Sequence, residues 1–235
     1  MPSNHPTPLH IAIIPDGNRR WAKAQSLHPW KGHEKAIENF RMLTDWCQSD
    51  PRIGALTVWC FSTENWKRDP KEVSKLMTLL EEYIIRERPN LQKEKTRLVH
   101  SGRTDRLPAS LVKLLKEVRK ETEHFTEFTL NLAVDYGGKD EIIRATRKAT
   151  ESYQLPTTNY QLPDDPIHPF LDHPELPDID LIIRTSGEFR TSNFFLWQSA
   201  YAEWIFTEKL FPDFTANDLE KTVEEFERRK RRFGG

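Results

Sequence analysis

Apolar and polar positions alternate along the chain with two different periods, one typical of strands and one typical of helices. Segments rich in β-branched and aromatic residues predict strands at 10–14, 54–61, 96–102, 127–138, 179–185 and 202–206. Apolar residues spaced three and four apart predict helices at 32–48, 70–91, 108–125, 139–153 and 215–233. Pro89 is expected to kink or stop the helix at 70–91. Residues 155–177 hold six prolines and predict an irregular loop.

This alternation predicts a single α/β domain with a central, mainly parallel six-stranded sheet flanked by helices. We expect residues 10–235 to form the domain and residues 1–9 to be a flexible lead. In such sheets ligands bind beyond the carboxyl ends of the strands. The polar residues that follow each predicted strand are therefore the candidates for a functional site.

The composition narrows the class of protein. The 235 residues carry a formal net charge of −1, so no global basic field indicates a nucleic-acid partner. No apolar run approaches the ~18 residues of a membrane span, and the first ten residues lack the apolar core of a signal peptide. Cys47 and Cys60 both lie in apolar surroundings, which favours reduced core cysteines over a disulfide. These features indicate a cytoplasmic protein.

The first cluster of candidate residues follows the strand at 10–14. It consists of Asp16, Gly17, Asn18, Arg19 and Arg20. Asp-Gly-Asn is also an ordinary turn signal. However, glycine permits close backbone approach and the two guanidinium groups suit phosphate oxygens. A carboxylate beside them suits a Mg²⁺ ion held against a diphosphate.

Two further clusters follow later strands. The end of the strand 179–185 and the stretch after it supply Arg184, Arg190 and Ser192, which can donate to a second anion. The stretch after 54–61 supplies Ser62, Glu64, Asn65, Trp66 and Arg68. Glu203 follows the last strand or begins it. Two anion sites on one edge of a sheet, with no nucleophile beside a partnered base, predict an enzyme that joins two phosphorylated substrates.

The clusters form motifs that resemble a known family. The motifs are "DGNRRWAK" (16–23), "FSTENWKR" (61–68), "LNLAVDYGGKDEI" (130–142), "IIRTSGEFRTSNFFLWQSAYAE" (182–203) and "RRFGG" (231–235). In this order they resemble the cis-prenyltransferases, the undecaprenyl diphosphate synthase family. The resemblance implies a Mg²⁺-dependent enzyme of isoprenoid biosynthesis that adds isopentenyl diphosphate to an allylic diphosphate. It further implies a homodimer that contacts membranes peripherally to release its product.

The resemblance also implies a role for each matching residue. Asp16 and Asn65 would be catalytic, with Mg²⁺ held by Asp16 and Glu203. The allylic diphosphate would be bound by Gly17, Asn18, Arg19, Arg20, Trp21 and His33. The primer and the condensing carbons would be positioned by Ser62, Glu64, Asn65, Trp66 and Arg68. Isopentenyl diphosphate would be bound by Arg184, Arg190 and Ser192, and the partner subunit's site would be reached by Arg232 and Gly234.

Several positions depart from the family pattern. Pro29 stands where members usually have an arginine, Ala36 where they usually have a glycine, and Arg19 where many have a glycine. These changes leave two reactions open, the regular synthesis of a polyprenyl diphosphate and a short or irregular condensation of dimethylallyl units. A non-catalytic partner subunit is a remote alternative. An apolar tunnel for the product is expected between 70–91 and 54–61.

Overall fold

The computed structural model describes residues 8–153 and 163–229. The strands in this part of the chain are β1 (Leu9–Ile14), β2 (Ile53–Ser62), β3 (Thr96–Ser101), β4 (Phe128–Tyr136), β5 (Leu181–Arg184) and β6 (Glu203–Phe206). The α-helices are α1 (Asn18–Ala24), α2 (Pro29–Ser49), α3 (Pro70–Lys93), α4 (Ala109–Thr122), α5 (Gly138–Tyr153) and α6 (Ala216–Arg228). Short 3₁₀ helices are η1 (Asn65–Lys67), η2 (His168–Phe170) and η3 (Phe211–Asp213).

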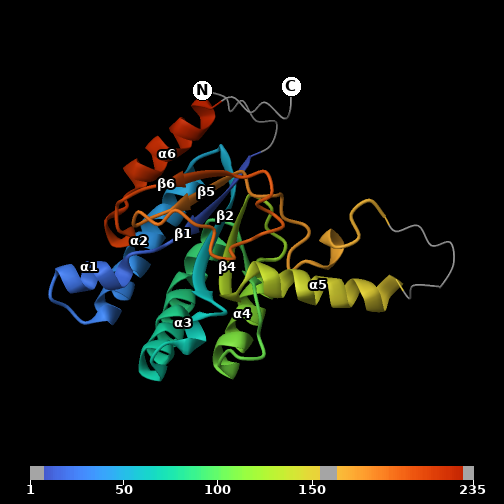
Figure 1. The fold of residues 1–235 in the computed structure, drawn as a ribbon, viewed down its shortest axis with the longest axis horizontal. Coiled ribbons are helices and arrows are strands. Elements are labelled where there is room, and N and C mark those ends of the chain that lie inside the picture. Colours follow the sequence, from blue (N-terminus) through green and yellow to red (C-terminus); the bar gives the residue numbers. More distant parts are fainter. Residues whose placement is uncertain (1–7, 154–162, 230–235) are drawn as a thin grey trace.

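The strands form one six-stranded sheet in the order β3-β4-β2-β1-β5-β6 (Figure 1). Every neighbouring pair of strands in it is parallel. The predicted α/β class with a mainly parallel six-stranded sheet is therefore confirmed. Because all strands point the same way, their carboxyl ends share one edge of the sheet, and the loops that carry the three clusters meet there.

Side chains alternate between the two faces of the sheet, as the period of a strand requires. In β1, Ile11 and Ile13 join the larger core together with apolar residues of α2, α3, α4 and α6. The intervening Ala12 and Ile14 join a second, smaller core on the other face, built around Phe194. Helix α5 extends away from the body of the molecule (Figure 1). Both faces of the central strand β1 are therefore buried, which explains why all its residues except His10 are apolar.

The helix at α3 differs from the prediction at its end. It continues through Pro89 and ends at Lys93, two residues beyond the predicted end. Proline removes its own backbone donor and so the bond to the carbonyl of Ile85, but it does not end the helix here. Leu91, which is buried in the larger core, holds the last turn in place. No helix in the described part of the chain is long and apolar enough to cross a membrane.

Two irregularities interrupt the pairing of β2 with β4 near the carboxyl edge. Trp59 pairs with Ala133 and Phe61 pairs with Val134, which leaves Cys60 as an extra residue on β2. The following pair is Ser62 with Tyr136, which leaves Asp135 as an extra residue on β4. Such β-bulges redirect side chains, often beside functional sites. Asp135 also has a positive φ of 53°.

Candidate functional site

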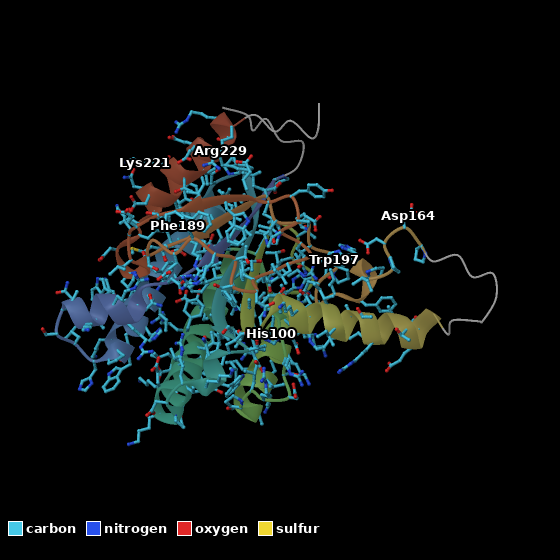
Figure 2. The ribbon with its side chains drawn as sticks, viewed as in Figure 1. His100, Asp164, Phe189, Trp197, Lys221 and Arg229 are labelled. Carbon is cyan, nitrogen blue, oxygen red and sulfur yellow. The ribbon has the colours of Figure 1, made fainter. Side chains whose placement is uncertain are left out.

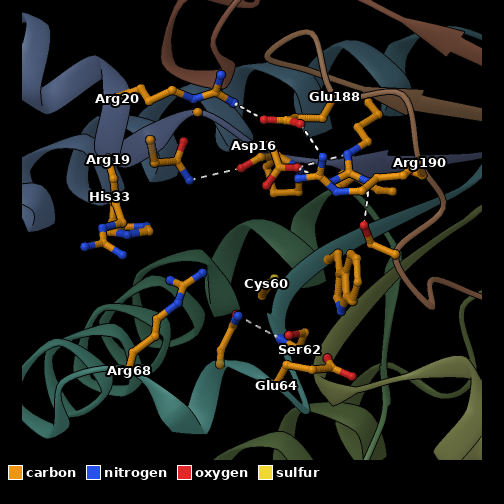
Figure 3. A pocket seen from close by; sticks show the side chains of 18 residues that line it. Asp16, Arg19, Arg20, His33, Cys60, Ser62, Glu64, Arg68, Glu188 and Arg190 are labelled. Carbon is orange, nitrogen blue, oxygen red and sulfur yellow. Dashed lines mark hydrogen bonds and ion pairs between the residues drawn. The ribbon is translucent and has the colours of Figure 1, made fainter.

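A pocket of about 510 Å³ opens at the carboxyl edge of the sheet (Figure 3). We call it the rim pocket. Predicted residues from all three clusters line it, namely Asp16, Gly17, Asn18, Arg19, Arg20, His33, Ser62, Glu64, Asn65, Arg68, Arg184, Arg190 and Ser192. The strand topology thus brings together segments that lie more than 160 residues apart, as the carboxyl-edge rule predicted.

An ion pair between the first and third clusters lies at the centre of the rim pocket. Arg184 ends β5, and its guanidinium donates from Nε and Nη2 to Oδ2 of Asp16 at 3.0 and 2.7 Å. Its Nη1 donates to Oγ of Ser192 at 2.8 Å and to the carbonyl of Arg190. The side chain of Arg184 is 4% exposed, whereas that of Asp16 is 38% exposed. The arginine is therefore fixed, while the carboxylate still faces the pocket.

Gly17 joins β1 to α1 at a position that only glycine fits. Its φ is 102°, and a Cβ atom there would lie 2.8 Å from Leu210 Cδ2 and 3.0 Å from Ser186 Cβ. The tight connection lets α1 begin at Asn18, so that Arg19 and Arg20 reach the pocket from its first turn.

Glu188 is a pocket residue that the sequence did not single out. It accepts hydrogen bonds from Nη2 of Arg20 at 3.1 Å and from Nη1 of Arg190. The two arginine side chains are 53% and 59% exposed. Their guanidinium groups therefore share one carboxylate at the mouth of the pocket (Figure 3), and a phosphate group could take its place. In the sequence, the only sign of its role is its place between Arg184 and Arg190, two of the predicted anion-binding residues.

Another acid, Glu72, does not line the rim pocket but contacts two arginines that do. Its carboxylate is 3.3 Å from Nη1 of Arg68 and 4.0 Å from Nε of Arg19. His33 Nε2 is 3.9 Å away and has no hydrogen-bond partner. Burial, together with the nearby Arg68 and Arg19, lowers the pKa of His33 to about 4. The imidazole is therefore neutral near pH 7 and makes no ion pair with Glu72.

The central cluster is ordered by hydrogen bonds around η1. Oδ1 of Asn65 accepts from the backbone N–H of Ser62 at 3.1 Å, so its amide nitrogen is the part that a ligand could reach. Glu64 accepts from Nδ2 of Asn193 at 3.3 Å. Burial alone would raise the pKa of Glu64, but hydrogen bonds from the backbone, Ser62, Thr63 and Asn193 lower it. Glu64 is therefore a carboxylate near pH 7.

An apolar cavity of about 90 Å³ continues inward from the rim pocket. Its walls come from α2, α3 and β2, and include the ring pair Phe40 and Tyr83, whose centroids are 4.9 Å apart. The segments expected to wall a tunnel thus line this cavity. Asn18, His33 and Cys60 line both spaces, so the two adjoin. Burial raises the pKa of the Cys60 thiol to about 12, so that the group stays uncharged.

Two predicted tryptophans do not line the rim pocket. Trp66 donates from Nε1 to Oδ1 of Asp135 at 2.8 Å, and its ring packs edge-on against Phe61. Trp21 lies on α1 and donates from Nε1 to Oδ1 of Asp213 at 2.9 Å. Both side chains therefore brace neighbouring segments, and the prediction that they touch substrate finds no support in their placement.

Glu203 lies at the edge of the sheet where the strands begin, opposite the carboxyl edge that carries the rim pocket. It begins β6 and pairs with Leu181, the first residue of β5, rather than following the strand. Its carboxylate accepts from Nη1 of Arg229 at 3.1 Å, near the end of α6 in Figure 2. Within one chain it therefore cannot share a metal ion with Asp16. Arg232 and Gly234 lie outside the described residues.

The arrangement suits a ligand with an anionic head and an apolar tail. The rim pocket holds more arginines than acids, since Arg19, Arg20, Arg68, Arg184 and Arg190 face Asp16, Glu64 and Glu188. Planar guanidinium groups bind phosphate oxygens through paired hydrogen bonds. The adjoining cavity offers almost only apolar side chains. In the described part of the chain, no group of three or more His, Cys, Asp or Glu side chains is placed to hold a metal ion.

Comparisons with known proteins find similar chains both by sequence and by structure. The model of the undecaprenyl diphosphate synthase family, Prenyltransf, matches residues 14–234. The isoprenyl transferase of Rhodopirellula baltica is 41% identical over 97% of this chain and 93% of its own length. The isoprenyl transferase of Thermotoga maritima is 43% identical over 97% of both chains.

Two solved structures resemble the fold over nearly its whole length. One is lavandulyl diphosphate synthase from Lavandula x intermedia in complex with dimethylallyl diphosphate, with a TM-score of 0.89, 32% identity, and coverage of 97% of this chain and 99% of that chain. The other is a probable undecaprenyl diphosphate synthase from Campylobacter jejuni, with a TM-score of 0.81, 31% identity, and coverage of 98% and 100%.

Proposed function

Because the chain belongs to the undecaprenyl diphosphate synthase family of prenyltransferases, we propose that it is a Mg²⁺-dependent cis-prenyltransferase. It would join isopentenyl diphosphate to an allylic diphosphate and release a cis-polyprenyl diphosphate. The observation that carries this proposal is an arginine-rich pocket that shares lining residues with an apolar cavity, since both substrates combine a diphosphate with a hydrocarbon.

The two anion-binding sides of the rim pocket suit the two diphosphates. Arg184, Arg190 and Ser192 from the β5 side would bind isopentenyl diphosphate. Gly17, Asn18 and Arg20 from the β1 side would bind the allylic diphosphate. Each hydrogen bond to a charged group contributes about 1.5–3 kcal/mol, so a few such bonds on each side are enough for specific binding.

Asp16 fits a Mg²⁺ ion. Arg184 occupies Oδ2, and the carboxylate remains 38% exposed toward the pocket. Proteins commonly bind Mg²⁺ through one or two carboxylates, with substrate phosphate oxygens and water as the other ligands. Asp16 would hold the ion against the diphosphate, where the ion supplies charge neutralisation for the leaving group.

The residues present suit the steps of condensation. The allylic C–O bond breaks, and its electron pair leaves with the diphosphate. The double bond of isopentenyl diphosphate then attacks the allylic carbon, and a proton is lost. Arginine donors stabilise the leaving group, while the rim pocket orients two substrates side by side. The apolar cavity would hold the hydrocarbon away from water, which stabilises binding by roughly 0.8 kcal/mol for each buried CH₂ group.

A short or irregular condensation of dimethylallyl units is the second candidate. The lavandulyl diphosphate synthase fold matches with a TM-score of 0.89, and the apolar cavity has a volume of only about 90 Å³. Pro29 begins α2 where the resemblance calls for an arginine, so that residue provides no cation for the primer. Regular synthesis remains our first candidate because the isoprenyl transferases, at 41% and 43% identity, are more similar to this chain than the lavandulyl diphosphate synthase is, at 32%.

We also propose that the enzyme is a homodimer. β6 is an outer strand of the described sheet, and aromatic residues gather beside it. The ring of Phe189, which is 74% exposed, lies 5.1 Å from that of Phe206, and Phe206 stacks on Trp204 at 5.7 Å. Exposed apolar patches of this kind mark protein interfaces.

The direct test is incubation of the purified protein with labelled isopentenyl diphosphate, Mg²⁺, and dimethylallyl, geranyl or farnesyl diphosphate in turn. We expect butanol-extractable labelled product with at least one primer, lost on chelation of Mg²⁺. An arm with dimethylallyl diphosphate alone reports the irregular reaction. An absence of product in every arm, with a folded protein, would contradict both candidates. Product without Mg²⁺ would contradict the metal assignment.

A further inference from the structure

Asp135 occupies an unusual place at the end of β4. It is the extra residue of a β-bulge, between the pairs Phe61–Val134 and Ser62–Tyr136. Its φ of 53° lies in the left-handed region, which residues other than glycine seldom adopt, although Asp and Asn do so more readily than most. The residue is fully buried. The bulge thus holds a buried carboxylate at the edge of the sheet where the rim pocket lies.

This carboxylate joins the loops that follow β2 and β3 to the end of β4. It accepts from Nε1 of Trp66 in η1, after β2, at 2.8 Å. It also accepts from Nε of Arg106 at 2.9 Å and from Nη2 of the same residue, after β3. The guanidinium of Arg106 lies over the ring of Trp66, 5.7 Å from its centroid. We call Asp135, Trp66 and Arg106 the rim hub.

The backbone of Asp135 takes part in the same contact. Its carbonyl accepts from the N–H of Arg103 at 3.1 Å. Gly102 packs so closely that a Cβ atom there would lie 2.2 Å from the carbonyl oxygen of Val134 and 2.9 Å from that of Asp135. The loop after β3 is therefore held against the bulge by main-chain contacts as well as by the carboxylate.

The rim hub includes a residue of the short segment that carries two residues of the rim pocket. Trp66 is the middle residue of η1, which spans only Asn65–Lys67. Asn65 precedes it and Arg68 follows that helix, and both line the rim pocket, whereas Trp66 does not. Fixing one tryptophan ring therefore fixes the backbone that presents an amide and a guanidinium to the substrates.

We propose that Asp135 is a positioning residue for the prenyl transfer reaction, which acts through Trp66 to hold Asn65 and Arg68 in the rim pocket. The inference rests on the proposed function for its kinetic consequence. Displacing a catalytic group by about 1 Å can cost roughly 100-fold in rate, so a hub that holds η1 affects turnover without touching the substrates.

The disrupting variant is Asp135→Gly, since glycine adopts the left-handed backbone without strain and removes only the carboxylate. We expect kcat to fall roughly 10- to 100-fold and KM for the allylic diphosphate to rise. KM for isopentenyl diphosphate should stay the same, because Arg184 and Arg190 belong to the β5 side. Asp135→Asn, which keeps an acceptor for Trp66, should stay within about threefold of the wild type. Wild-type kcat in folded Asp135→Gly would overturn the proposal.

A second variant keeps the proposal testable if Asp135→Gly fails to fold. Trp66→Phe keeps an aromatic ring but removes the N–H donor, and it should lower kcat as well. Combined with Asp135→Gly it should cost little more than either change alone, because both remove the same link. Wild-type kcat in Trp66→Phe, or fully additive losses, would overturn the proposal.

Asp50→Ala is the matched control, since it also removes a carboxylate. Asp50 also receives paired hydrogen bonds from one arginine, Arg52, at 2.6 to 3.2 Å, but it precedes β2 at the opposite edge of the sheet. We expect unchanged kcat and KM values in the folded control. Losses equal to those of Asp135→Gly would show that any broken arginine–carboxylate pair has this effect, and would overturn a specific role.

A measurement without turnover separates this inference from the proposed function. In ¹⁵N-resolved NMR spectra, the side-chain amide of Asn65 should shift in Trp66→Phe and in Asp135→Gly, and not in Asp50→Ala. A wild type that makes no prenyl product but shows these shifts would contradict the proposed function and leave the rim hub intact. An unmoved Asn65 amide in both hub variants would contradict the hub itself.

Discussion

Arg184 is the most buried arginine of the rim pocket, and it organises the others. Its guanidinium contacts the carboxylate of Asp16, the hydroxyl of Ser192 and the carbonyl of Arg190 at once. Lysine carries the same charge but cannot reach several partners in one plane. Arg184 is thus both a structural bond between two clusters and, in our proposal, a ligand for isopentenyl diphosphate.

Replacing Arg184 with lysine should therefore lower kcat/KM for isopentenyl diphosphate roughly 10- to 100-fold, the equivalent of one or two charge-assisted hydrogen bonds. Steady-state kinetics with varied isopentenyl diphosphate checks this. Ser110→Ala, at an exposed hydroxyl that bonds Glu81 away from the rim pocket, is the control and should leave kcat/KM unchanged. A lysine variant with full kcat/KM would contradict the assigned role.

Acid should destabilise the protein through His33. Its pKa falls from 6.5 to about 4 on folding, mainly because burial disfavours the cation. Below about pH 6.5, His33 therefore binds a proton in the unfolded chain but not in the folded chain. The free energy of unfolding then decreases as the pH falls, down to about pH 4. His33→Gln should remove this dependence, so the free energy of unfolding should lose about 2 kcal/mol less between pH 7 and pH 5 than in the wild type. Urea titrations at both pH values measure the difference.

The exposed His124 supplies the control for this pH effect. His124→Gln should keep the wild-type loss of stability between pH 7 and pH 5. Equal losses in the His33→Gln variant and the wild type would show that His33 takes up a proton in the folded protein, contrary to our assignment of a neutral imidazole.

Sequence motifs located the rim pocket at the residue scale but did not reveal which way each side chain points. Asp16, Arg20, Arg184 and Arg190 were predicted to meet, and they do. Trp66 was expected to face substrate, yet it bonds Asp135. Its direction depends on a bulge that arises between strands far apart in sequence, which local spacing cannot show. The spacing of four residues between Arg68 and Glu72 is visible in the sequence, but the approach of Glu72 to Arg19 is not, because it depends on how distant segments pack.

The amino end of α6 carries a capping box that can be tested at the scale of one element. Oγ1 of Thr215 accepts from the N–H of Asp218 at 3.3 Å, and the carboxylate of Asp218 accepts from the N–H of Thr215 at 2.9 Å. Thr215→Ala should destabilise the protein by about 1 kcal/mol and lower Tm by roughly 2–4 °C. Calorimetry checks this shift.

A threonine in the middle of a helix is the control for the cap. Thr146 lies on the exposed face of α5 and donates to the carbonyl of Ile142 at 2.8 Å. Since alanine has the higher helix propensity, Thr146→Ala should leave Tm unchanged or raise it slightly. Equal losses in both variants would show that the box contributes nothing beyond the threonine itself.

At the element scale, periodicity predicted every strand of the sheet but not every boundary. The last strand was expected at 202–206, and it starts at Glu203. Whether this residue follows or begins the strand decides which edge of the sheet it occupies. The pattern of apolar residues does not fix that point, because the partner strand β5 sets the register. Glu203 therefore lies away from Asp16 although its motif matches.

At the scale of the whole molecule, the apolar cavity should limit the length of the product. The rings of Phe40 and Tyr83 both line the cavity, with their centroids 4.9 Å apart, and Phe40 is 6% exposed. Phe40→Leu should enlarge the cavity and lengthen the product by at least one isoprene unit, at a cost of about 1–2 kcal/mol in stability. Mass spectrometry of extracted products measures the change, which depends on the proposed function.

The control for the cavity is a core substitution that leaves the cavity alone. Phe226 of α6 is 2% exposed and lines neither the rim pocket nor the apolar cavity. Phe226→Leu should therefore cost similar stability and leave the product distribution unchanged. A longer product in both variants would attribute the effect to general loosening of the core, and an unchanged product in Phe40→Leu would remove Phe40 from the wall that limits length.

The aromatic residues beside β6 should form the interface of the proposed homodimer. An outer strand beside an exposed apolar side chain invites pairing with another chain, and Phe189 lies beside β6 on the side of the molecule away from α5 (Figure 2). Phe206→Glu places a charge between Phe189 and Trp204, so it should convert a dimer of twice 27.7 kDa into a monomer. Light scattering coupled to size-exclusion chromatography reads this mass directly. Ile85→Glu, at an exposed isoleucine of α3, is the control and should remain dimeric. A monomeric wild type would contradict the proposed homodimer. A dimeric Phe206→Glu variant would show that the interface lies elsewhere.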